Sequence, residues 1–267
     1  MSFALSSKLR LAAAVGALSL AAAAPASADT VIALVGGKAL ALVDASTLKV
    51  SGAVELTGAS DLVGIDVRPA DGMLYGVTAA GDIVTIDPKS GAATKKSTLS
   101  EKIPAGAKVT VDFNPMADRL RILTDGGMSL RVNVDDGKAT VDGSLKYAET
   151  DMHKGEKPNI VAGAYTNSVN GKKAEKTELY DIDATIPALV KQAPPNDGVL
   201  SAIGKIDVKL SGPVGFEIAA MADGKNAGWL MAGGALYSID LATGKTTKAG
   251  DIEGGKDVTD IAWWPKS

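Results

Sequence analysis

The chain contains no cysteine and a single histidine, His153. These absences exclude structural disulfides, a cysteine nucleophile and zinc sites built from cysteine and histidine. Aromatic residues make up only 4% of the sequence, whereas glycine occurs 30 times, so Val, Ile, Leu and Ala must supply the core. Apolar residues at 46% and charged residues at 22% are typical of a globular protein and not of a disordered one.

Excess positive charge is also lacking, because the formal net charge is −3. It falls to −5 if Lys8 and Arg10 are removed with the N-terminal segment. A basic surface for nucleic acid or anionic lipid is therefore excluded, and we expect no nucleic-acid partner.

Residues 1–28 have the pattern of a secretory signal peptide. Lys8 and Arg10 precede an apolar run over residues 11–24, and small residues follow at Ala26 and Ala28. The run is too short to span a bilayer, which requires about 20 apolar residues. We predict cleavage between Ala28 and Asp29, a periplasmic or secreted mature protein over residues 29–267, and no membrane span.

Two short elements recur along the mature chain, and helical periodicity is scarce. The first element is a strand that ends in an acid or amide, at Asp44, Asp87, Asn133, Asp183 and Asp240. In three copies a glycine follows four residues later. An Asp or Asn side chain at a strand end accepts a backbone hydrogen bond two residues on, and glycine supplies the positive φ that closes the turn.

The second element opens each of the four later repeats, at residues 64–69, 111–115, 162–167 and 215–219, and a fifth copy lies at residues 260–265. The first repeat, residues 31–56, lacks it, while the fifth copy has no strands after it. The C-terminal copy can therefore supply the opening strand that the first repeat lacks, as in a circular array closed by strand exchange between the chain ends.

These repeats of about 45 to 50 residues predict an all-β fold, a β-propeller of five blades in a single domain. The N- and C-terminal strands share one blade. The expected blades are 258–265 with 31–57, 61–103, 109–150, 159–206 and 212–252. A solenoid explains the period equally well but not the divided first repeat.

The chain resembles the bacterial family called domain of unknown function 4394. The motifs that carry the resemblance are residues 62–69, 72–75, 111–115, 118–121, 130–133, 164–167, 179–183 and 192–196. The resemblance covers nearly all of the mature chain and implies no activity, cofactor or catalytic residue.

Arginine supplies one candidate binding site. Arg119, Arg121 and Arg131 fall within the third repeat, whereas lysine dominates elsewhere. A guanidinium binds a carboxylate or phosphate at two points, so these three residues could hold a small anion. Alternatively, the arginines pair with Asp66, Asp112 or Asp118 and tie blades together.

A second candidate, for a polar ligand, combines Tyr165, Thr166 and Asn167 with Asn196, although Asn196 could simply shape a turn. His153 lies in a polar loop, where we expect a solvated residue. The predicted binding residues are Arg68, Asp112, Asn114, Arg119, Arg121, Arg131, Tyr165, Asn167 and Asn196.

The sequence favours an exported, monomeric, non-catalytic binding or interaction module with no cofactor, no catalytic residue and no metal site. Its partner would be a protein or a small polar or anionic ligand. The alternative is a metal-assisted hydrolase or lactonase with its site in the central channel. Propellers host both kinds of function.

Overall fold

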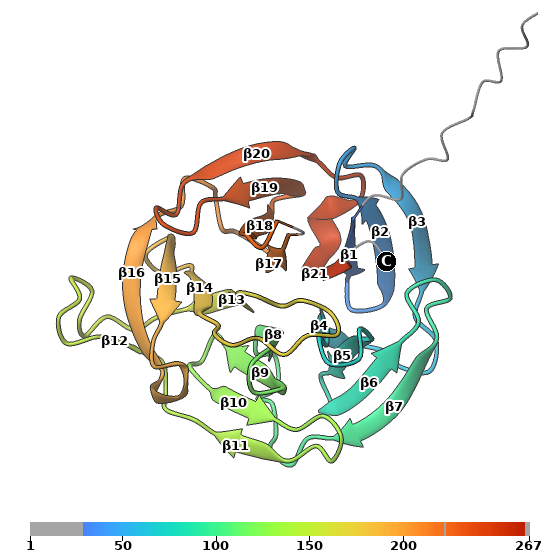
Figure 1. Cartoon of the computed structure of the whole chain (residues 1–267), viewed down its shortest axis with the longest axis horizontal. Coiled ribbons are helices and arrows are strands. Elements are labelled where there is room, and N and C mark those ends of the chain that lie inside the picture. Colours follow the sequence, from blue (N-terminus) through green and yellow to red (C-terminus); the bar gives the residue numbers. More distant parts are fainter. Residues whose placement is uncertain (1–28, 222, 265–267) are drawn as a thin grey trace, which may run out of the picture.

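The computed structural model describes residues 29–221 and 223–264. Five β-sheets surround a central axis (Figure 1), which confirms the predicted five-bladed β-propeller. The predicted signal peptide, residues 1–28, lies outside the described residues. Among the described residues no helix is long and apolar enough to cross a membrane.

The first blade joins the two ends of the chain, as the divided repeat predicts. Its strand order is β21-β1-β2-β3. The inner strand β21 (Val258–Trp264) pairs antiparallel with β1 (Thr30–Val35), with Trp263 opposite Val31. The outer strands are β2 (Ala39–Asp44) and β3 (Val50–Glu55).

The next two blades are four-stranded antiparallel meanders. The second blade contains β4 (Leu62–Val67), β5 (Leu74–Thr78), β6 (Asp82–Ile86) and β7 (Ala93–Thr98). The third contains β8 (Val109–Asn114), β9 (Arg119–Thr124), β10 (Ser129–Val132) and β11 (Ala139–Val141).

The fourth sheet has five strands, and the prediction of its boundary was wrong by one short strand. β12 (Lys146–Tyr147), expected in the third blade, pairs in parallel with β16 at the edge of the fourth. The chain segment at β12 thereby bridges two blades. The rest of this sheet is β13 (Ile160–Tyr165), β14 (Leu179–Asp183), β15 (Ala188–Gln192) and β16 (Val199–Lys205).

The fifth blade is again a four-stranded meander, and two short 3-10 helices lie in connections. Its strands are β17 (Val214–Ala220), β18 (Asn226–Ala232), β19 (Ala235–Ile239) and β20 (Thr246–Asp251). The helices are η1 (Pro195–Asp197) and η2 (Gly255–Asp257).

The recurring acid-and-glycine turn links neighbouring blades. The Asp87 carboxylate accepts the backbone N–H of Lys89, as predicted, and Gly91 follows with a φ of +73°. A Cβ at Gly91 would collide with the carbonyl oxygen of Glu55, in the outer strand of the preceding blade. Glycine is therefore required both by the turn and by the close approach of two backbones.

Hydrophobic side chains fill the spaces between blades. The inner strands β4, β8, β13, β17 and β21 are almost entirely buried, whereas outer strands such as β7 and β20 are largely exposed. One cluster packs Ala162 and Ala164 of the fourth blade against Phe216 and Ile218 of the fifth. Burial therefore decreases from the inner strands to the outer strands.

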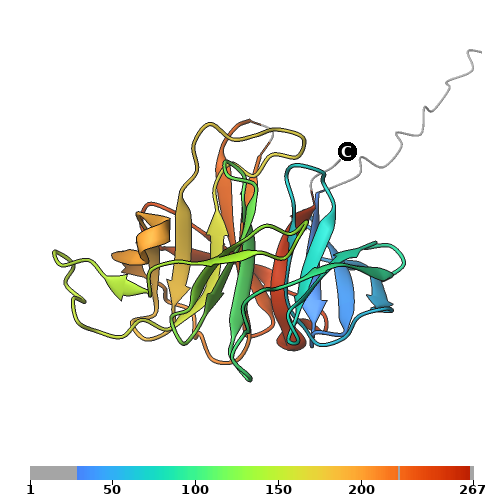
Figure 2. The same ribbon diagram turned by 90° about the horizontal axis from the view of Figure 1, so that it is seen from below.

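The two faces of the propeller differ. The inner strands begin at one face, here called the strand-start face, and end at the opposite, strand-end face. The 166–178 loop between β13 and β14 runs over the strand-end face towards β4 (Figure 1), and Figure 2 shows loops rising from that side. Gly171 N–H donates to the Pro69 carbonyl (2.7 Å) and Ala174 N–H to that of Pro115 (3.2 Å). The loop therefore ties the fourth blade to the second and third.

Candidate functional site

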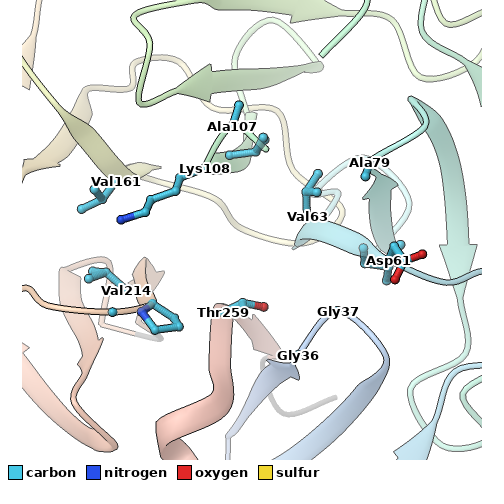
Figure 3. Close-up of a pocket in the computed structure, with 14 residues that line it drawn as sticks. Gly36, Gly37, Asp61, Val63, Ala79, Ala107, Lys108, Val161, Val214 and Thr259 are labelled. Carbon is cyan, nitrogen blue, oxygen red and sulfur yellow. The ribbon is translucent and has the colours of Figure 1, made fainter. Parts of the chain in front are cut away.

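A pocket of about 530 Å³ lies on the strand-start face, at the propeller axis (Figure 3). All five blades contribute to it. The first residues of the inner strands supply a wall of four valines and a threonine: Val63, Val109, Val161, Val214 and Thr259. Pro213 and Ala107 extend the apolar lining, and Lys108 and Asp61 are its charged residues.

Three β-bulges at the same level build this wall. Val63, Val161 and Thr259 are each the extra residue of a bulge, because pairing skips them in β4, β13 and β21. A bulge re-aims side chains and is common beside binding sites. In a regular strand, successive side chains point to opposite sides, so the bulges change which residues meet the axis.

A ring of buried carboxylates lies on the inner strands. Its members are Asp260, Asp66, Asp112 and Glu217, each 3–7% exposed. Each accepts a backbone N–H from the inner strand of the next blade: Ile65 to Asp260 (2.9 Å), Phe113 to Asp66 (2.6 Å), Tyr165 to Asp112 (3.0 Å) and Trp263 to Glu217 (3.3 Å). The ring therefore fastens four of the five blade junctions with hydrogen bonds.

The fifth junction is different, because β13 carries alanine and glycine where the others carry acids. Between the fourth and fifth blades, apolar packing around Ala164 and Phe216 takes the place of the carboxylate.

Burial raises the pKa of every carboxylate in this ring. The pKa values of Asp66, Asp112 and Asp260 lie well above the usual range for aspartate. For Glu217, burial raises the pKa to about 7, against lowering by the N–H groups of Ile218 and Trp263. Mutual repulsion within the ring adds to desolvation at Asp66 and Asp112, so the ring favours protons over charge.

Three members of the ring could supply ligands to a divalent cation. Oxygens of Asp66, Asp112 and Glu217 lie within 4.8 Å of one another. Carboxylate oxygens are the donors that Ca²⁺ and Mg²⁺ prefer. These oxygens are already aimed at backbone N–H groups, however, and none of the three residues lines the axial pocket.

Arg121 is the centre of a buried polar joint between the third and fourth blades. Its side chain is 2% exposed and donates to Tyr165 Oη (3.2 Å), Ser129 Oγ (3.0 Å), Asp142 Oδ2 (2.5 Å) and Asn196 Oδ1 (2.8 Å). Three of the predicted binding residues, Arg121, Tyr165 and Asn196, are thus brought together. Because these residues hydrogen-bond to one another across two blades, their contacts favour a structural role, in which they tie the blades together, over the binding of an anion.

Asp142 completes this joint by bridging two arginines. It is 4% exposed and receives both Nε and Nη2 of Arg131 (2.7 and 2.9 Å) besides Arg121. The Asp142 carboxylate raises the pKa of Arg131. Asp142 was not among the three acids expected as partners, because it lies beyond the next turn in the sequence.

Asn114 reaches this joint through a side-chain hydrogen bond with Tyr165, whereas Arg68, Arg119 and Asn167 make their contacts elsewhere. Arg68 joins the second blade to the third through Asp118 (Nε to Oδ1, 2.8 Å). Arg119 is exposed and donates to the carbonyl of Asp118. Asn114 accepts the N–H of Met116 in a turn, and Asn167 exchanges hydrogen bonds with Asn226 of the fifth blade. Their predicted role in binding stays a prediction.

Residues 39–262 match the family described as domain of unknown function (DUF4394). The chain belongs to this family. The resemblance seen in the sequence motifs is confirmed. Comparison with curated proteins finds no match.

The fold of this DUF4394 member is similar to several solved structures. A Bacteroides thetaiotaomicron protein of unknown function has a TM-score of 0.51 at 16% identity, covering 91% of this chain and 63% of that one. A chain of the nidogen/laminin complex has a TM-score of 0.52 at 11% identity, covering 88% and 98%. An auxiliary nutrient binding protein from Bacteroides ovatus has a TM-score of 0.43 at 16% identity, covering 79% and 56%. The present chain thus spans less than two thirds of both Bacteroides proteins. The likeness shows the fold alone.

In this DUF4394 member, sequence reasoning found Asp112 but missed the ring to which it belongs. The signal was present, since four of the five opening segments contain an acid within an apolar strand: Asp66, Asp112, Glu217 and Asp260. The axial pocket was missed entirely. Its valines look like ordinary core residues until the bulges are known.

Proposed function

We propose that this DUF4394 protein is an exported, non-catalytic binding module whose ligand is held in the axial pocket. One observation carries the proposal: inner strands of all five blades converge on a pocket of about 530 Å³ with a largely apolar wall. A concave apolar pocket with a few charged groups is typical of small-molecule sites.

The rigidity of the surroundings supports this role. Hydrogen bonds between inner strands fix the positions of neighbouring blades next to the pocket. The pocket wall is therefore preorganised in the absence of a ligand. The 166–178 loop covers the opposite face, so we expect a ligand to enter from the strand-start face. A preformed site reduces the entropy that binding costs.

A neutral, environment-sensitive naphthalene dye tests the pocket. We expect the fluorescence of the dye to increase when the mature protein is added. The increase should disappear in Val109→Phe, because Val109 is half-buried in the pocket wall and the larger ring would fill the pocket. Val141→Phe, on the exposed outer strand β11, is the matched control, since Val141 is 63% exposed. Equal dye binding by wild type and Val109→Phe would contradict the proposal.

Export rests on the pattern of residues 1–28 and is tested separately. We expect the protein in the periplasmic fraction or medium, with Asp29 as its first residue by mass spectrometry. A chain that retains its first 28 residues in the cytoplasm would refute export without affecting the pocket.

The second candidate function is a metal-assisted hydrolase or lactonase. The observation that favours it is the proximity of Asp66, Asp112 and Glu217. Elemental analysis of the purified protein separates the two candidates. One tightly bound divalent ion per chain, lost in Asp112→Asn, would support the enzyme over the binding module.

A further inference from the structure

The axial pocket is lined by one cation and one acid, which are placed differently. Lys108 precedes β8, and its side chain extends along the pocket wall towards Val161 (Figure 3). It is the one cation among the residues that line the pocket, and its ammonium group makes no ion pair within the described part of the chain. The Lys108 ammonium is therefore free to meet a ligand.

The acid of the same pocket is placed differently. Asp61 lies across the opening, and its carboxylate points away from it (Figure 3). That carboxylate accepts a hydrogen bond from the Ser60 hydroxyl (3.4 Å). Asp125, the other acid near Lys108, accepts that residue's backbone N–H (3.2 Å) and does not line the pocket. A ligand inside the pocket therefore meets the cation before either acid.

The rest of the wall offers hydrocarbon. Val63, Val109, Val161 and Val214 surround the axis, and Thr259 already donates its hydroxyl to the Leu34 carbonyl (3.3 Å). An apolar surface beside a single cation complements a molecule with an apolar body and one negative group. A strongly hydrated, multiply polar ligand such as a free sugar would leave its hydroxyl groups without partners here.

We propose that the axial pocket binds a monocarboxylate with an apolar body, its carboxylate paired with Lys108 and its hydrocarbon between the four valines. This inference rests on the proposed function and adds the chemical class of the ligand. It also separates the pocket from Arg121 and Arg131 of the third blade, whose donors are engaged within the protein.

Isothermal titration calorimetry with three ten-carbon probes tests the assignment. Decanoate, decanol and decylammonium share one chain length and differ in the charge of the head group. We expect decanoate to bind about tenfold more tightly than decanol, as for one hydrogen-bonded charge pair, and decylammonium to bind most weakly. Lys108→Gln should remove the preference for decanoate while leaving decanol binding unchanged.

Two further variants complete the design. Lys108→Glu should reverse the preference in favour of decylammonium. Lys146→Gln removes an exposed lysine from β12, at the outer edge of the fourth sheet, and should bind all three probes as wild type does.

The failures of the two proposals are distinguishable. If decanol and decanoate bind equally and Lys108→Gln changes neither, the assignment to carboxylates is wrong while the pocket remains a binding site. If no probe binds and Val109→Phe leaves the neutral dye unaffected, the proposed function fails as well.

Discussion

Two of the regions in which the protein buries ionisable groups stabilise them in opposite ways. At the joint between the third and fourth blades, the Asp142 carboxylate is enclosed by the guanidinium groups of Arg121 and Arg131. In the carboxylate ring around the axis, the acids have no cation and accept only backbone N–H groups. The joint is stabilised by opposite charges, whereas the ring is stabilised by protons and neutral donors.

This difference matters because removing one partner of a buried ion pair leaves the other charge buried without compensation. Removing one charge from the joint leaves the opposite charge buried and unpaired. Replacing a ring carboxyl group by an amide leaves no opposite charge unpaired, because the ring contains no cation. The same substitution, aspartate to asparagine, should therefore have unequal effects in the two regions.

The largest effect is expected for Asp142→Asn. The substitution leaves the buried guanidinium of Arg121 without its carboxylate, so the free energy of unfolding should fall by about 3–5 kcal/mol at pH 7. Asp112→Asn should cost about 1 kcal/mol or less, because an amide oxygen still accepts the N–H of Tyr165. Urea unfolding of the two variants checks the comparison, and equal losses would contradict it.

The second prediction concerns pH and arises from the ring alone. Since burial raises the pKa of Glu217 from 4.5 to about 7, the folded chain retains a proton that the unfolded chain has released. Its contribution to stability is complete below about pH 4.5 and is lost as the pH rises through 7. The free energy of unfolding should fall by about 2.5 kcal/mol between pH 5 and pH 8 from this residue.

Glu217→Gln identifies the residue responsible for this dependence. The variant cannot ionise, so its melting temperature should change less between pH 5 and pH 8 than that of wild type. Glu253→Gln, at an exposed position, is the control and should show the wild-type slope. An unchanged slope in Glu217→Gln would refute this account of the ring.

The third prediction sharpens the account of the joint. Lysine retains the charge of arginine but not its planar fork, so Arg121→Lys should lose about 1–3 kcal/mol of stability. Arg131→Lys should lose about 1 kcal/mol or less, because the side chain of Arg131 is 35% exposed and its ion pair is partly solvated. Thermal unfolding of both variants measures the two losses of stability. A larger loss for Arg131→Lys than for Arg121→Lys would contradict the prediction.

The smallest effect is expected from chelation. If protons and backbone N–H groups satisfy the ring, EDTA should leave the melting temperature unchanged, and added Ca²⁺ or Mg²⁺ should not raise it. A clear loss of stability in EDTA, restored by one of these ions, would mean that a cation holds Asp66, Asp112 and Glu217 together. It would also favour the enzyme hypothesis.

The sequence predicted the architecture well because the turns and the repeats are local signals. The Asp87 and Gly91 pair closes a turn in any context, and the missing opening segment of the first repeat identified β21 as its complement. β12 was misplaced because its two residues, Lys146 and Tyr147, pair in parallel with a strand more than 50 residues away. No local pattern encodes such a pairing.

The candidate site was predicted less well, for a physical reason. Whether an arginine ties blades together or binds a ligand depends on which acid reaches its side chain. Asp142 meets Arg121 only after β9, β10 and the following chain are folded. Similarly, Val63 and Val161 face the pocket because of bulges, which interrupt the alternation that sequence reasoning assumes. Which residues face the axial pocket is decided only when all five blades have assembled around the axis.

The pairing of β1 with β21 also sets the order in which this molecule can mature. Leu34 and Asp260 are register partners, although more than 220 residues separate them along the chain. Contacts so distant in sequence form slowly, because a long loop must close first. On a ribosome the earliest strands therefore emerge with one edge open and must wait for the last to be synthesised. A nascent chain of this kind cannot close its ring of blades until its translation is complete.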